Sequence, residues 1–97
     1  MIHELKTEPE YFEAALRGEK TFEVRKDDRN FQTGDYLALN EHSREEETYT
    51  GRSLLVEVVY VLKDPEYCKE GYATMSIRRC RVETEGEMLD RMGKVLL

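Results

Sequence analysis

The sequence has no tryptophan, and only two cysteines, two histidines and two prolines occur among its 97 residues. Cys68 and Cys80 have neither the number nor the spacing of a disulfide framework or a zinc site, so both are expected to be thiols. His3 and His42 are too few for a histidine-based metal centre unless carboxylates complete it. We therefore expect no metal and no cofactor.

The sequence also lacks a long apolar run. No stretch approaches the roughly 20 apolar residues that span a bilayer, and the first residues lack the apolar region of a signal peptide. A cytoplasmic protein without membrane contact is therefore expected. Its length is that of one small domain.

Positive charge is not in excess, because the net charge is −6. Generic adhesion to a phosphate backbone, which depends on counterion release, is thereby disfavoured. The charge is uneven, however: acidic residues gather at 8–13, 45–47 and 83–90, and basic residues at 17–29 and 78–81. This distribution leaves open a small, specific nucleic-acid contact on a basic face, or a protein partner that meets the acidic surface.

The first part of the chain predicts a short strand at residues 2–6 and then a helix at residues 8–17. Thr7 and Glu10 have the spacing of a capping box, and the apolar residues of the helix recur at helical spacing: Tyr11, Phe12, Ala15 and Leu16. Gly18 is the expected helix stop. Residues 20–26 then alternate as a half-buried strand, with Phe22 and Val24 expected to face the core.

The second part predicts strands at residues 36–40, 53–62 and 72–78, with Leu37 and Leu39 facing inward. The run at 53–62 is the longest apolar stretch and should be the central strand. Residues 85–92 have helical propensity, so a terminal helix or a frayed tail is expected there. The expected fold is α+β, a small mixed β-barrel of about five strands with one helix between strands 1 and 2.

Residues 18–25 contain more chemically capable groups than any other segment, in the pattern Gly-x-Lys-x-x-Glu-x-Arg. Glu23 and Arg25 are two apart on one strand face, which fits either an ion pair or recognition of a base, with the carboxylate accepting from an amino group. Lys20 could neutralise a phosphate or act as a base. Strict alternation places it on the Phe22 side, so it joins Glu23 only if the strand bulges or starts after it.

Three motifs carry a family resemblance. The first is Gly18-x-Lys20-x-x-Glu23-x-Arg25, and the others are Phe31-x-x-Gly34-Asp35-x-Leu37-x-Leu39 and Gly71-Tyr72-x-x-Met75-Ser76-Ile77. Together they resemble ASCH domains of the PUA-like superfamily, and most of all the uncharacterised ASCH-like, RNA-binding-like proteins of bacteria and their phages. The resemblance implies a PUA-like domain over residues 1–80, with residues 81–97 as a C-terminal extension. It also implies a cleft beside the first motif that binds RNA or a nucleotide-like ligand.

One branch of this family hydrolyses acetylcytidine with the motif lysine, a threonine three residues later and a distal glutamate. Lys20 matches, but Glu23 stands where that branch has threonine, and the segment that carries the distal glutamate has shrunk to residues 63–71. The resemblance therefore favours binding over catalysis. The alternative is a small amidohydrolase for a modified nucleoside, with Lys20 as nucleophile or base and Glu23 as its acid/base partner.

A third hypothesis is a phage or accessory protein-interaction module that uses the acidic surface. Under the binding hypothesis, the residues expected to contact the ligand are Lys20, Thr21, Glu23, Arg25, Asp35 and Arg52. Further candidates are the arginines Arg78, Arg79 and Arg81 for phosphate contacts and the tyrosines Tyr36, Tyr49 and Tyr72 for base stacking.

Overall fold

The computed structural model describes residues 1–84 and 87–90. Its elements in chain order are β1 (Ile2–Thr7), α1 (Pro9–Leu16), β2 (Phe22–Lys26), β3 (Tyr36–Ser43), β4 (Thr48–Leu62), β5 (Tyr72–Thr84) and β6 (Glu87–Asp90). The predicted α+β class, with one helix between the first two strands, is confirmed. Among the described residues, no helix has the length and apolar character needed to cross a membrane.

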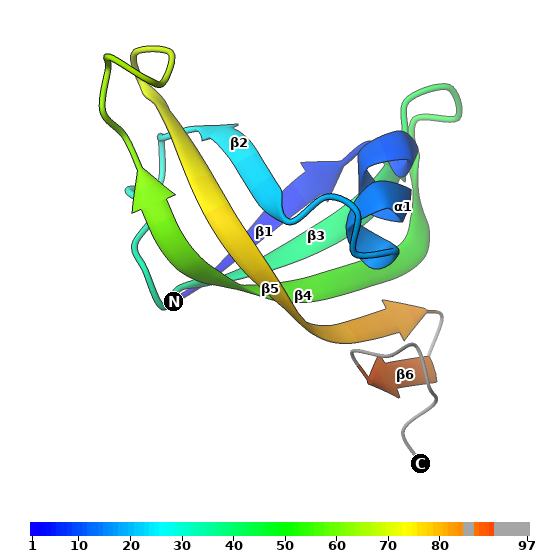
Figure 1. Ribbon diagram of the computed structural model, residues 1–97. Coiled ribbons are helices and arrows are strands. Elements are labelled where there is room, and N and C mark those ends of the chain that lie inside the picture. The colour runs from blue at the N-terminus through cyan, green and yellow to red at the C-terminus, as the bar shows by residue number, and fades with distance from the viewer. Residues whose placement is uncertain (85–86, 91–97) are drawn as a thin grey trace.

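The strands form one mixed sheet in the order β1-β3-β4-β5-β2, and β6 pairs with β5 off this path. β1 pairs with β3 in parallel, and the other pairings are antiparallel. The predicted central strand is confirmed, because β4 lies in the middle of the path. The sheet curls into a half-barrel, so β2 and β1, the two ends of the path, come to face each other (Figure 1).

The core lies on the concave side of the sheet. The period-two pattern of the strands places alternate apolar side chains there, and Leu37 and Leu39 are fully buried as expected. Phe12 and Ala15 of α1 are buried against the same cluster. The helix therefore covers the concave face, and within residues 1–84 and 87–90 no second layer lies on the convex face of the sheet (Figure 1).

The predicted facing of β2 is wrong. Phe22 and Val24 are 47% and 52% exposed, whereas Glu23 is 2% exposed. β2 is the last strand of the path, so its outer face is uncovered and its inner face meets the end of β1 instead of the apolar core. The inward position therefore takes a carboxylate, which is stabilised there by two cations.

The start of α1 also differs from the prediction. Thr7 is the last residue of β1, where it pairs with Glu41, and the N-cap is Glu8, with φ −65° and ψ 147° and no side-chain cap. Thr7 therefore lies one residue before the N-cap, and its hydroxyl accepts from Arg25. The stop is confirmed: Gly18 has φ +79° and its N–H donates to the carbonyl of Ala15.

The C-terminal helix predicted at residues 85–92 is contradicted where the structure describes the chain, because Glu87–Asp90 form β6. Residues 85–86 and 91–92 of that prediction lie outside the described part. A helix of eight residues is marginal by itself, whereas β5 continues to Thr84, past the boundary expected at residue 80, and its edge there can pair with a strand.

Candidate functional site

An open groove of about 620 Å³ follows the free edge of β2, between this strand, the end of β1 and α1. β1 and its junction with the helix contribute Lys6, Thr7 and Glu8, and α1 contributes Glu10, Tyr11 and Ala14. The opposite wall comes from the helix-to-strand connection and β2: Glu19, Lys20, Phe22, Glu23, Val24 and Arg25. The groove therefore contains three of the side chains expected from the motif.

The helix stop brings Lys20 into the groove. After Gly18 the chain folds back, so that the N–H groups of Glu19 and Lys20 both donate to the carbonyl of Ala14. β2 begins only at Phe22, so strand alternation does not fix the direction of Lys20. This is the condition under which Lys20 was expected to join Glu23, and its ammonium does donate to Glu23 Oε2.

The Glu23 carboxylate lies between two cations. Lys20 Nζ contacts Oε2, and Arg25 Nε donates to Oε1 at 2.9 Å. The side chain of Glu23 is nearly buried, and a buried carboxylate needs this pairing because desolvation of an unpaired charge is costly. Both oxygens are engaged inside the protein, so Glu23 fixes the two cations in place.

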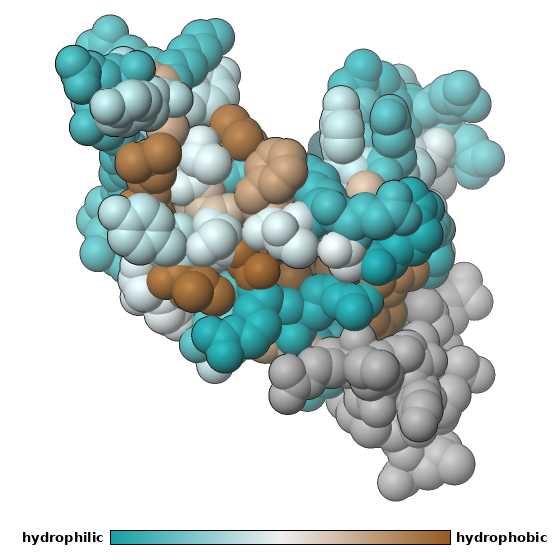
Figure 2. Space-filling view, viewed as in Figure 1, coloured by the Kyte–Doolittle hydropathy of each residue, from teal (hydrophilic) through white to brown (hydrophobic). Residues whose placement is uncertain are grey.

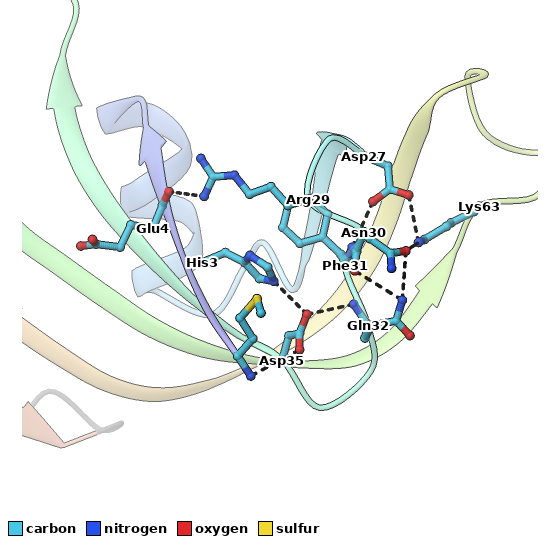
Figure 3. Close-up of polar contacts among 10 residues, drawn as sticks. His3, Glu4, Asp27, Arg29, Asn30, Phe31, Gln32, Asp35 and Lys63 are labelled. Carbon is cyan, nitrogen blue, oxygen red and sulfur yellow. Dashed lines mark hydrogen bonds and ion pairs between the residues drawn. The ribbon is translucent and has the colours of Figure 1, made fainter.

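Arg25 also joins the two ends of the sheet. Its Nη1 donates to the carbonyl of Lys6 at 3.0 Å, and its Nη2 to the hydroxyl of Thr7 at 3.1 Å. Arg29 acts similarly, with Nη1 2.7 Å from the carbonyl of Glu4 (Figure 3). Two arginine side chains thus donate hydrogen bonds to the outward-facing carbonyls of β1. In a closed barrel, these carbonyls would take part in a ladder of main-chain hydrogen bonds.

The main chain of β2 offers further polar groups. Hydrogen bonds to β5 and the turn before it flank the strand at Thr21 and Asp27. Because antiparallel ladders alternate, the main-chain groups of Phe22 and Val24 point away from β5, toward the groove. The carbonyl of Phe22 accepts from Lys20 Nζ at 2.6 Å. Val24 therefore presents a main-chain donor and acceptor pair at this free edge.

Two aromatic rings border the groove, Tyr11 of α1 and Phe22 of β2, and each is about half exposed. Lys20 Nζ lies 5.0 Å from the centroid of the Phe22 ring. Of the apolar residues that recur at helical spacing, Phe12 and Ala15 are buried, whereas Tyr11 is exposed and lines the groove together with Ala14. The three-residue spacing of Tyr11 and Ala14 was the available signal.

Two other predicted site residues lie away from the groove. Thr21 is exposed and does not line it. Asp35 is buried near the beginning of β1, where Oδ2 is 2.8 Å from His3 Nε2 and accepts from the N–H of Gln32 (Figure 3). Burial alone would raise the pKa of Asp35, but these hydrogen bonds and the N-terminal ammonium outweigh it and lower the pKa.

Arg52 lies beside a smaller recess, of about 390 Å³. Its Nε donates to Glu41 Oε1 at 2.8 Å, and its Nη2 contacts Glu13 of α1. The hydrogen bond from Arg52 lowers the pKa of the Glu41 carboxyl despite its burial, and raises the pKa of Arg52 itself. The guanidinium also lies 4.9 Å from the ring centroid of Phe12. Arg52 therefore fastens α1 to the β3–β4 hairpin.

The C-terminal arginines are distributed in a similar way. Arg79 Nη1 donates to the carbonyl of Leu16, so it satisfies the end of α1. Arg78 Nε lies 3.6 Å from Glu57 Oε1 on the convex face. No cluster of three or more His, Cys, Asp or Glu side chains that could hold a metal occurs within residues 1–84 and 87–90.

Comparison with known proteins gives two findings. The family described as a domain of unknown function (DUF3850) matches residues 2–77. An uncharacterised 12.9 kDa protein in the GpA 3′ region of Escherichia phage P2 is 40% identical over 60 residues, which cover 62% of this chain and 53% of the phage protein. The alignment thus spans about half the length of that relative.

Proposed function

The chain belongs to the DUF3850 family, and we propose that it binds a nucleotide within RNA, or a modified nucleobase, in the groove along β2. The observation that carries this proposal is the pair of cations, Lys20 and Arg25, held around Glu23 beside two exposed aromatic rings. The resemblance of the motif to ASCH domains supports it, and we extend the proposal to a PUA-like assignment of the curled sheet.

The cations have hydrogen-bonding capacity left for a phosphate. An ammonium has three N–H donors, and Lys20 uses two of them, on Glu23 and on the carbonyl of Phe22. A guanidinium has five, and Arg25 uses three. The remaining donors are charged and held in place by Glu23, which suits them to the oxygens of a phosphate.

The rim of the groove is less acidic than its composition suggests. Glu8 Oε1 is 2.8 Å from Arg44 Nη2, and Glu19 is bonded to Arg17. These two carboxylates are compensated by arginines outside the groove lining. The approach of an anionic ligand to Lys20 and Arg25 is therefore not opposed by them.

A base has both a stacking partner and a polar edge in the groove. Tyr11 supplies an exposed ring on the helix side, and Val24 supplies main-chain donor and acceptor groups on the strand side. Stacking on an aromatic side chain and hydrogen bonding to an unpaired base edge are the usual means of recognising single-stranded RNA. In this arrangement the phosphate lies near Lys20 and the base lies between Tyr11 and β2.

The test is a titration of the protein with the four 5′-mononucleotides, followed by amide chemical shifts. We expect shifts at residues 18–26 and near Tyr11, and a loss of affinity of about tenfold in Lys20→Ala, because one charged hydrogen-bond donor is removed. Lys26→Ala is the matched control, since it removes the same charge from the end of β2, outside the groove lining. Shifts absent from residues 18–26 for every nucleotide, with modified nucleosides included, would disprove the proposal.

One contact favours a second candidate, the hydrolysis of a modified nucleoside such as acetylcytidine. Lys20 Nζ donates directly to Glu23 Oε2, so proton transfer to Glu23 would leave an amine that acts as a base. The same two side chains also bond to Arg25 and to the carbonyl of Phe22, contacts that hold them in place for binding. Incubation with acetylcytidine tests this second candidate. Deacetylation that Lys20→Ala abolishes would establish hydrolase activity, and unchanged substrate at high protein concentration would exclude it.

A further inference from the structure

The convex face of the sheet carries apolar side chains that no second layer covers in the part of the chain that the structure describes. Phe22 and Val24 of β2 are exposed there, and Tyr60 of β4 is 64% exposed. Figure 2 shows hydrophobic side chains gathered over the region where β2, β5 and β4 run side by side in Figure 1. Exposed apolar side chains that gather on one face of a small protein indicate an interaction surface.

The strand register arranges these residues in two rows across the face. In the first row Phe22 is opposite Ser76, and Ser76 is opposite Tyr60. In the second row Val24 is opposite Thr74, and Thr74 is opposite Leu62. The middle strand thus contributes small hydroxyl residues, and its neighbours contribute large apolar ones. The face is a shallow trough whose first row has an aromatic ring on each side, about 10 Å apart across two strand spacings.

The charge around this trough differs from that of the whole chain. At the outward positions between the Lys26–Tyr72 pair and the Arg78–Glu57 pair, Glu57 is the only acidic residue, and Arg78 lies beside it. Lys26 is on the same face, and Lys69 Nζ is 5.0 Å from the centroid of the Tyr72 ring. The strand positions of the trough thus carry no uncompensated carboxylate in a chain of net charge −6, and the acidic residues nearest to them, Asp64, Glu66 and Glu70, lie in the loop beyond the strand ends. These strand positions suit an anionic partner.

We propose that this face, formed by β2, β5 and the end of β4, is a second contact surface for single-stranded RNA. One nucleotide of the RNA occupies the groove, and its neighbours stack against Phe22 and Tyr60. The inference rests on the proposed function of the groove and extends it from one nucleotide to a short strand. The two surfaces are continuous, because Phe22 and Val24 line the groove and also belong to the trough. The hydroxyl groups of Ser76 and Thr74 can bond to sugar or base edges between the stacked bases.

The test compares the four 5′-mononucleotides with random-sequence single-stranded RNA octamers, by amide shifts for the first and fluorescence anisotropy for the second. We expect octamers to bind at least tenfold more tightly than any mononucleotide. Tyr60→Ala should weaken octamer binding roughly 5- to 100-fold, the cost of one lost stack, and leave mononucleotide affinity unchanged. Ser76→Glu, which places a carboxylate in the trough, should have the same selective effect. Tyr67→Ala is the matched control, because Tyr67 is 75% exposed in the loop after β4.

The outcomes separate the two proposals. Octamers that bind no more tightly than mononucleotides, or that bind Tyr60→Ala and wild type equally, would overturn the trough and leave the groove intact. Mononucleotides that fail to bind, with octamer binding that still depends on Tyr60, would overturn the groove and support the trough. Absence of binding by both ligands would overturn both. Self-association by sedimentation velocity that Tyr60→Ala abolishes would identify the face as an interface between copies and would overturn its assignment to RNA.

Discussion

Glu23 holds Lys20 and Arg25 in position because its two carboxylate oxygens each take one of them. The substitution Glu23→Gln keeps the shape of the side chain and removes its charge, which leaves two cations facing each other across a nearly buried amide. We expect the free energy of unfolding to fall by about 2–3 kcal/mol and mononucleotide affinity to fall with it, because the cations are no longer fixed.

Urea denaturation measures the first effect and the nucleotide titration the second. Glu19→Gln is the control, since the pair of Glu19 with Arg17 is exposed and should contribute little to the free energy of unfolding. Equal losses of stability in the two variants would show that Glu23 does not hold the groove together.

Protonation of Asp35 is expected to contribute to the acid denaturation of the protein. Its pKa is lowered in the folded protein, because hydrogen bonds from His3 and Gln32 and the nearby N-terminal ammonium outweigh the effect of burial. A carboxyl with a depressed pKa contributes stability above its unfolded pKa, about 4, and loses it as the pH falls through the folded value. Between about pH 5 and pH 2, wild type should therefore lose more unfolding free energy than Asp35→Asn. Parallel stability curves for the two proteins would contradict this.

At the scale of elements, Arg52 adds a polar link between α1 and the sheet to the apolar packing of Phe12 and Ala15. This guanidinium joins the buried Glu41 of β3 to Glu13 of the helix. Arg52→Met keeps much of the apolar stem but leaves Glu41 as an unpaired buried carboxylate, so we expect a loss of about 3 kcal/mol in the free energy of unfolding. Adding Glu41→Met should restore part of that loss, because the unpaired charge is then absent.

Thermal or urea unfolding of the single and double variants measures both effects. Arg44→Met is the matched control: its pair with Glu8 also joins the hairpin to the helix region, but the arginine side chain is 82% exposed and should contribute little. A double variant no more stable than Arg52→Met would show that the orphaned carboxylate is not the cause.

Most elements of this fold follow from periodicity in the sequence. Leu37 and Leu39 face the core, and Gly18 ends the helix. Both features could be predicted because each depends only on residues that are close in the sequence. The facing of β2 does not follow in this way. Alternation shows that Phe22 and Val24 share a side, but which side is covered depends on the curl of the whole sheet and on β2 being its last strand. The same limit applies to β6, which pairs with an edge that β5 provides.

The candidate site was predictable where one short segment supplies it. Lys20, Glu23 and Arg25 come from one motif and meet in one groove. Asp35 and Arg52 were expected there as well, but distant partners, His3 and Glu41, hold them elsewhere. No local pattern could reveal these contacts, because they join separate strands.

At the scale of the whole molecule, the half-barrel is closed by side chains instead of a strand ladder. Arg25 and Arg29 donate to the carbonyls of Lys6 and Glu4, alternate residues on the outer edge of β1. Because arginine side chains, and not main-chain hydrogen bonds, bridge β1 and β2, space remains between the two strands. The groove occupies the part of this space that lies near Lys6. Closure and ligand binding therefore share Arg25, whereas Arg29 takes part in closure without lining the groove.

This division of roles can be tested with a matched pair of variants. Arg29→Met should lower the free energy of unfolding by about 1 kcal/mol and speed amide hydrogen exchange in β1 about fivefold, because the strand loses one charged donor. Its affinity for mononucleotides should stay within about twofold of wild type, since Arg29 is outside the groove. Arg25→Met should show the same faster exchange and also lose at least about tenfold in affinity. Equal affinities of the two variants would mean that Arg25 acts in closure alone, and that the ligand contacts of the groove come from Lys20 and the edge of β2.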